Sequence, residues 1–131
     1  MTTGDLQQRT FDFAQRVVKV CLILDQQPGV SRLLARQLFR SGTSVGANVE
    51  EGQASRSRAD FVATYSIACR EARETHYWLR LLVTCQLLPE HRVHDLLDEA
   101  NQLIAILTTI VKRSRRKLKG VTSNAPETPR T

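Results

Sequence analysis

The sequence predicts an all-α protein, an antiparallel up-down-up-down four-helix bundle. Apolar residues recur at every third or fourth position in four long segments, and no segment shows the alternation that is typical of a strand. The connections between these segments are short, which favours antiparallel packing of successive helices. A chain of 131 residues is sufficient for one such domain, and no stretch is apolar enough to span a bilayer.

The first helix is predicted over residues 6–26 and the second over residues 31–52, from apolar positions that alternate between spacings of four and three. Pro28 and Gly29 separate these helices, because neither residue type favours a helix interior. Ser31 is predicted to cap the second helix, since its hydroxyl can accept a hydrogen bond from the exposed amides of the first turn.

The third helix is predicted over residues 58–87 and the fourth over residues 89–119, each with one apolar seam. Ser57 and Asp60 resemble a capping box at the start of the third helix, with aspartate in place of the usual glutamate. Pro89 fits the first position of the fourth helix, because the amide hydrogen that proline lacks would have no partner there.

The net charge of +6 comes from one short segment. Residues 1–111 hold equal numbers of basic and acidic side chains, and so do residues 120–131, which we expect to form a disordered tail after Gly120 ends the helix. Cations are favoured at a helix C-terminus by the helix dipole, but six basic side chains without an acidic one are more than capping of the helix end requires. We therefore predict that nucleic acid contacts the basic side chains of residues 112–119, which are Lys112, Arg113, Arg115, Arg116, Lys117 and Lys119.

Two further groups of basic residues lie within the helices. Arg32 and Arg36 are one turn apart on the second helix, and they fit either a solvated face or an addition to the nucleic-acid surface, to which we assign them. Arg73, Tyr77 and Arg80 share one face of the third helix, where an aromatic ring between cations could stack on a base or simply pack.

Gly42 and Gly46 form a G-x-x-x-G pair inside the second helix, where a bundle would normally bury larger residues. Each glycine in a helix interior costs about 1 kcal/mol relative to alanine, so another interaction should offset it. Three interpretations remain open from the sequence. They are tight packing within the bundle, a helix contact between subunits, and a flexible hinge.

Polar side chains occupy seam positions of the second and third helices. Glu71 and Glu74 lie on one face, and Arg40, Arg70 and Arg73 could pair with them. We expect a half-buried network that fixes either the helix order or the angle between subunits. The residues predicted to make structural or subunit contacts are Arg40, Ser41, Gly42, Gly46, Asn48, Glu50, Glu51, Glu71, Glu74 and Trp78.

The same carboxylates invite comparison with a di-iron centre, which the spacing does not support. Ferritin-like bundles use Glu-x-x-His on two helices, and this chain contains no such motif. His91, His94 and Asp95 come at the start of the fourth helix, where we expect them to be exposed to solvent. There is also no nucleophile motif and no glycine-rich phosphate loop, so we expect no catalytic residue, metal or cofactor.

The segment from Arg40 to Thr84 carries a family resemblance. It contains RSGTSVGANVEEG at residues 40–52 and EARETHYWLRLL at residues 71–82. With these motifs the chain resembles, over residues 6–113, the bacterial four helix bundle protein family, which includes the ribosomal-RNA intervening-sequence proteins. It is also similar to the accessory variability proteins of diversity-generating retroelements. At Gly52 many relatives carry alanine, a difference that we expect to be harmless at a helix end.

The resemblance implies a homopentameric ring. Its retroelement branch implies that the protein acts together with a structured RNA and a reverse transcriptase. The residues themselves also indicate an oligomer. The third helix carries a second apolar stripe beside its core seam, and such surplus surface is usually covered by another subunit. The stripe consists of Ile67, Trp78, Leu81 and Cys85.

We therefore expect a non-enzymatic oligomeric scaffold that binds nucleic acid, RNA in particular, through the basic end of its fourth helix. The alternative is a protein–protein interaction adaptor, in which the glycine stripe and the aromatic residues dock a partner protein. We expect a cytoplasmic location, because the polar N-terminus is unlike a signal peptide. Cys21, Cys69 and Cys85 lie in apolar-periodic segments, which favours buried and reduced thiols.

Overall fold

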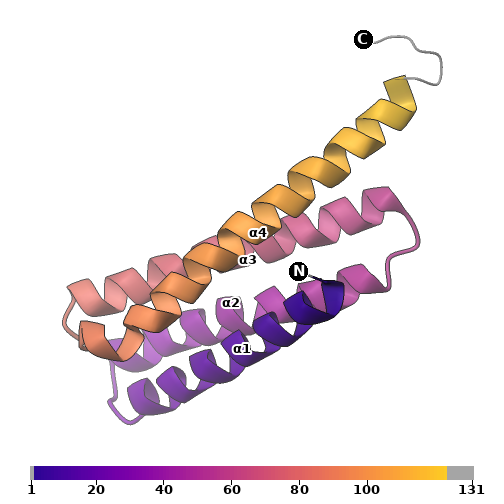
Figure 1. Ribbon diagram of the computed structural model, residues 1–131. Coiled ribbons are helices and arrows are strands. Elements are labelled where there is room, and N and C mark those ends of the chain that lie inside the picture. Colours follow the sequence, from indigo (N-terminus) through magenta and orange to yellow (C-terminus); the bar gives the residue numbers. More distant parts are fainter. Residues whose placement is uncertain (1, 124–131) are drawn as a thin grey trace.

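The computed structural model describes residues 2–123 and contains four antiparallel helices (Figure 1). Each helix packs against the next one in the chain, whereas α1 and α4 touch much less. The helices are α1 (Thr3–Asp25), α2 (Val30–Gln53), α3 (Arg58–Thr84) and α4 (Glu90–Ser123). The predicted up-down-up-down bundle is confirmed. In the described part of the chain, none of the helices has the length and apolar character that a membrane crossing requires.

One apolar seam from each helix contributes to a common core. Phe13 on α1, Leu38 on α2, Leu79 on α3 and Leu107 on α4 are all fully buried. Each such side chain stabilises the fold by about 1.5–3 kcal/mol through its removal from water. The positions that the spacing of three and four selects therefore hold the bundle together.

A capping box starts α1 earlier than the predicted residue 6. The amide of Asp5 donates to Thr2 Oγ1 at 3.1 Å, and the amide of Thr2 donates to Asp5 Oδ2 at 3.1 Å. These bonds satisfy two amides of the first turn, so the helix begins at Thr3. The hydrogen bond from the Thr2 backbone also lowers the pKa of the Asp5 carboxyl.

The predicted N-cap of α2 is wrong by two residues. Gly29 is the cap, with a φ of 91° that a residue with a side chain rarely adopts. Its carbonyl accepts from the amides of Arg32 and Leu33 at 3.1 and 3.2 Å. Ser31 lies inside the helix and is buried, which its small side chain permits.

The predicted Ser57 cap of α3 is confirmed, because Ser57 Oγ accepts from the amide of Asp60 at 3.1 Å. The helix ends at Thr84 rather than at the predicted residue 87. Its last carbonyls are satisfied by a Schellman motif, in which the amide of Leu87 donates to the carbonyl of Leu82 at 2.9 Å. Gln86 takes the left-handed position of this motif with a φ of 61°. Glycine usually occupies that position, so the glutamine in this sequence does not predict the turn.

The last helix is longer than predicted. It starts at Glu90, directly after Pro89, and runs through Gly120 to Ser123, so the predicted end at residue 119 is wrong. Nothing lies within 4 Å of a Cβ built on Gly120, and this glycine has no positive φ that would break the helix. The part of the predicted tail from residue 124 onward lies outside the described residues.

Gly42 and Gly46 are buried against α1. A Cβ on Gly42 would lie 2.6 Å from Val17 Cγ1, and one on Gly46 would lie 3.1 Å from the carbonyl oxygen of Thr10. Of the three interpretations, tight packing within the bundle therefore fits the structure, and neither glycine is open to a second copy. The close approach of the two helices offsets the cost of glycine in a helix interior.

Gly52 is also a packing residue. A Cβ at this position would lie 2.4 Å from Cε1 of Tyr65, a buried ring of α3. Glycine therefore fits this position, and an alanine here would require the ring to move.

Two of the three cysteines are buried as expected. Cys21 contacts the carbonyl of Ala35 at 3.4 Å, and burial raises the pKa of its thiol to about 11. Cys69 is buried between α3 and α4, where Ile104 and Thr108 are its neighbours. Cys85 is exposed, because it follows the last turn of α3.

Candidate nucleic-acid interface

The predicted polar network exists, and it joins α2 to α3 within one chain. Arg40 Nη1 donates to Glu71 Oε1 at 3.3 Å, and Arg40 also forms an ion pair with Glu74. Glu74 Oε2 accepts in addition from the indole nitrogen of Trp78 at 3.0 Å. Glu71 is buried with 7% of its surface exposed, and the predicted partner Arg70 also lies 4.0 Å from its Oε2, so its charge depends on these two arginines.

A pair of buried hydroxyls lies in the same seam. Thr75 Oγ1 and Ser41 Oγ are 3.0 Å apart and hydrogen-bonded, which explains why small polar residues occupy core positions here. Asn48, also predicted as a seam residue, instead donates to the carbonyl of Ser44 in its own helix at 2.8 Å. Beside their shared apolar core, α2 and α3 are therefore connected by the arginine–carboxylate cluster, by this hydroxyl pair and by the hydrogen bond from Gln53 Nε2 to Tyr65 Oη at 2.5 Å.

Glu50 and Glu51 lie apart from the network. Glu50 Oε1 accepts from Gln7 Nε2 of α1 at 3.0 Å, and both groups are exposed. Glu51 is exposed near the end of α2. These two residues were predicted alongside Glu71 and Glu74, but the structure places them on the surface.

The other side of α3 presents cations that have no acidic neighbours. A cavity of about 150 Å³ lies between α3 and α4, and it is lined by Arg73, Lys112 and Arg115 together with Ser66 and Thr108. Within residues 2–123, no carboxylate oxygen comes within 4.0 Å of these three cations. The predicted pairing of Arg73 with the carboxylates of α3 is therefore wrong, because Arg73 faces α4.

Neutral groups hold the two arginines of this cavity. Arg73 Nη1 donates to Cys69 Sγ at 3.2 Å, and the same sulfur lies 3.3 Å from Thr108 Oγ1. Arg115 Nη2 donates to Ser66 Oγ at 3.3 Å. The guanidinium groups are thus oriented by uncharged partners, and their positive charges stay uncompensated.

The predicted basic segment forms the exposed end of α4. All six of its cations are exposed, whereas Ser114 between them is buried against the bundle. Figure 1 shows these turns, in yellow, extending past the ends of the other helices. The seam of α4 continues through Ser114, where Lys112 and Arg115 line the cavity between α3 and α4, and the basic segment ends on the projecting turns.

Arg32 and Arg36 do not join this surface within one chain. They lie beside the α1–α2 turn, at the end of the bundle away from the C-terminus of α4 (Figure 1). Arg32 Nε donates to the carbonyl of Asp25 at 2.9 Å and lies 3.7 Å from its carboxylate. Both arginines line a groove of about 350 Å³ together with Leu22 and Phe39.

Tyr77 is an exposed aromatic on the same helix as Arg73. Its surface is 49% exposed, and the guanidinium carbon of Arg80 lies 5.8 Å from the ring centroid. Trp78 meets the ring edge-on, with the centroids 5.1 Å apart. The predicted grouping of cations and an aromatic residue on α3 thus has the exposed side chain of Tyr77 at its centre.

The exposed apolar side chains lie mainly on α1 and α2, rather than on the predicted second stripe of α3. On α3, Ile67, Trp78 and Leu81 are half-buried within the chain. By contrast, the largest exposed side chains of the first two helices are Phe11, Leu22, Ile23, Val30, Leu33 and Phe39. The signal in the sequence was a second stripe on α1, where Phe11, Val18 and Leu22 recur at helical spacing.

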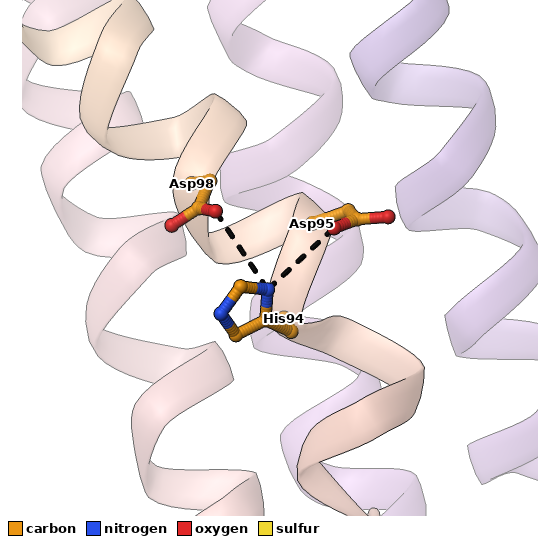
Figure 2. Close-up of side chains that lie close together, drawn as sticks. All are labelled: His94, Asp95 and Asp98. Atoms are coloured by element: carbon orange, nitrogen blue, oxygen red, sulfur yellow. Dashed lines mark ion pairs between the residues drawn. The ribbon is translucent and has the colours of Figure 1, made fainter.

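One group of potential metal ligands appears among the described residues. His94 Nδ1 lies 3.5 Å from Asp95 Oδ1 and 3.7 Å from Asp98 Oδ2, and the three side chains lie close together on α4 (Figure 2). All three side chains are exposed and come from one helix, so no second element fixes their positions. The arrangement is that of a surface ion pair, which contributes at most about 1 kcal/mol.

The fold and its charges define the class of this protein, a four-helix bundle with an internal polar seam and a projecting basic helix end. Residues 3–109 match the family described as 23S rRNA-intervening sequence protein, and this chain belongs to that family. No curated protein matches the chain. A crystal structure of a protein with unknown function from the S23 ribosomal protein family of Bacteroides thetaiotaomicron is similar, with 32% identity and a TM-score of 0.78. The alignment covers 86% of this chain and 99% of that one.

Proposed function

We propose that this protein is a non-enzymatic, oligomeric RNA-binding scaffold whose contact surface is the basic end of α4. One observation carries the proposal: six exposed cations at the C-terminal end of α4, with no acidic residue among residues 112–119. Such a cluster neutralises backbone phosphates and releases their condensed counterions, whatever the base sequence. The family description, which refers to intervening sequences of 23S rRNA, favours RNA over DNA.

Assembly would strengthen this binding. We propose that copies associate through the exposed apolar face of α1 and α2, because its side chains are too large and numerous for an isolated surface. Cyclic symmetry keeps every copy in the same orientation along the axis, so all the basic ends would lie on one rim. A five-membered ring, which the family resemblance implies, would then bind one RNA through several sites.

The RNA contact is tested by removing charge from the projecting end. The variant Arg113→Gln, Arg116→Gln, Lys117→Gln keeps helix-forming residues and leaves the cavity between α3 and α4 untouched. We expect weaker binding to every RNA, with the slope of log affinity against log salt reduced by roughly 2 for single strands. Fluorescence anisotropy with labelled oligoribonucleotides over a salt series measures both quantities.

The matched control removes the same charge elsewhere. Arg16→Gln, Lys19→Gln, Arg92→Gln neutralises three cations that line a groove between α1 and α4. This control should keep nearly the affinity and slope of the wild-type protein. Equal binding by both triple variants would overturn the RNA proposal and favour the protein-adaptor alternative.

The oligomer is tested by sedimentation equilibrium. Leu22→Asp together with Phe39→Asp places charge on the exposed apolar groove of α1 and α2. We expect the wild-type protein to sediment as a multiple of the chain mass and this variant to sediment as a smaller species. A wild-type protein of single-chain mass at micromolar concentration would contradict the assembly.

A further inference from the structure

We propose that the cavity between α3 and α4 binds a backbone phosphate of single-stranded RNA, and that Tyr77 stacks on the adjoining base. This inference rests on the proposed function and names the class of RNA. The cavity is lined by Arg73, Lys112 and Arg115, with the hydroxyls of Ser66 and Thr108 beside them.

The charges of the cavity favour an anion. Three cations around one small space repel each other, and within residues 2–123 no carboxylate lies within 4.0 Å of them. This is the opposite of the α2–α3 seam, where Arg40 meets two carboxylates. A bound phosphate would relieve the repulsion, so the arrangement of the three cations is suited to receive one.

The donors of the cavity are also positioned in advance. Arg73 is held by Cys69 Sγ at 3.2 Å, and Arg115 by Ser66 Oγ at 3.3 Å. A guanidinium carries five N–H donors, so each arginine keeps donors for a phosphate after making its neutral contact. The volume of about 150 Å³ leaves room for one phosphate group between the arginines.

The surroundings indicate a polymer rather than free phosphate. Lys112 and Arg115 belong to both the cavity and the basic end of α4, so a strand held at the end can continue into the cavity. On the other side, Tyr77 lies one helical turn after Arg73, with 49% of its residue surface exposed. Arg80 lies 5.8 Å from the ring centroid and can add a cation–π contact to a stacked base.

The open ring favours single strands. In a duplex the base faces are stacked on their neighbours, whereas single-stranded RNA can place a base against an aromatic side chain. A phosphate in the cavity and a base on Tyr77 are adjacent parts of one nucleotide step. The α3–α4 side is therefore expected to prefer a single strand to a helix of the same length.

The test uses the full chain and a fluorescein-labelled ten-nucleotide oligouridylate. Arg73→Gln should weaken binding about tenfold through the loss of a charged hydrogen-bond donor, and should lower the salt slope by roughly 0.7. Tyr77→Ala should also weaken binding about tenfold but leave the salt slope unchanged, because stacking involves no counterion release. Arg70→Gln is the matched control, an exposed arginine of α3 outside the cavity, and should change affinity less than twofold.

Two further arms distinguish the possible ligands. A hairpin duplex of equal length should bind more weakly than oligouridylate. Inorganic phosphate, added at constant ionic strength, should compete with oligouridylate for the wild-type protein and much less for Arg73→Gln. If phosphate binds but Arg73→Gln keeps full RNA affinity, the cavity is a free-phosphate site and the inference fails.

The remaining outcomes separate this inference from the proposed function. Equal RNA affinities for Arg73→Gln and Arg70→Gln would overturn the cavity assignment, while the RNA proposal stands if the Arg113, Arg116, Lys117 variant still binds weakly. Equal binding of the hairpin would overturn the single-strand preference. Failure of the wild-type protein to bind any RNA would overturn the proposed function itself.

Discussion

The arginines on the two sides of α3 have opposite electrostatic surroundings. On the side that faces α2, Arg40 contacts the carboxylates of Glu71 and Glu74, and Trp78 donates to the second of these. On the side that faces α4, Arg73 donates only to neutral Cys69 and shares a cavity with two more cations. The residues are similar in type, but their surroundings differ in net charge.

This difference separates a structural role from a binding role. Charges that are paired and half-buried specify which helices meet, because breaking one pair leaves the other charge buried. Cations that gather without acids add repulsion to the folded state, so packing does not account for them. The α2 side therefore connects helices within the bundle, and the α4 side is the surface on which we propose that an anion binds.

The largest expected effect breaks the α2 side. Arg40→Met should lower the free energy of unfolding by about 1–3 kcal/mol, because the buried Glu71 carboxylate loses the nearer of its two cations and keeps only Arg70 at 4.0 Å. Urea unfolding followed by circular dichroism measures this loss. Arg36→Met, one turn earlier on an exposed position, is the control and should be nearly neutral. Equal losses in both variants would show that the network does not stabilise the chain.

A second variant changes stability without touching either side of α3. Gln86→Gly should raise the free energy of unfolding by up to about 1 kcal/mol, because glycine adopts the left-handed conformation of this turn without strain. Thermal unfolding checks the direction, and RNA affinity should stay at the wild-type value. A destabilised variant would contradict the Schellman motif that ends α3.

The corresponding change on the α4 side should have almost no effect on the free energy of unfolding. Arg73→Gln should alter the free energy of unfolding by about 0.5 kcal/mol or less, since it removes repulsion and no carboxylate contact. The same urea experiment compares it directly with Arg40→Met. A loss above 1 kcal/mol would make Arg73 a structural residue and remove the contrast between the two sides.

The smallest expected effect depends on pH. Burial and the neighbouring Arg80 lower the pKa of His76 below its ordinary value of 6.5. The unfolded chain therefore binds this proton at a higher pH than the folded chain, and stability falls as the pH drops from 6.5 through the folded pKa. Unfolding at pH 7.5 and at pH 5 should show a loss in the wild-type protein that is smaller in His76→Gln. An identical loss in both proteins would remove His76 as its source.

The helices follow from the sequence because their signal is local. A seam residue such as Leu38 or Leu107 stands at a spacing of three or four from its neighbours, and this period alone predicts a buried stripe. The helix ends are harder to predict from the sequence, because Gln86 and Gly120 have roles opposite to those that their residue types suggest. The first ends a helix in place of glycine, and the second continues one.

The sequence by itself determined the bundle and the position of the excess charge, because helical periodicity and a run of cations are written in neighbouring residues. Only the tertiary structure decided which arginine is paired, since Arg40 contacts Glu71 whereas Arg73 shares a cavity with Arg115, in both cases across a long separation in the chain. The tertiary structure also decided that Gly42 and Gly46 face α1 and that Phe39 is exposed. These outcomes depend on how each helix is rotated about its axis against its neighbours, and that rotation is set by the packing of all four seams together.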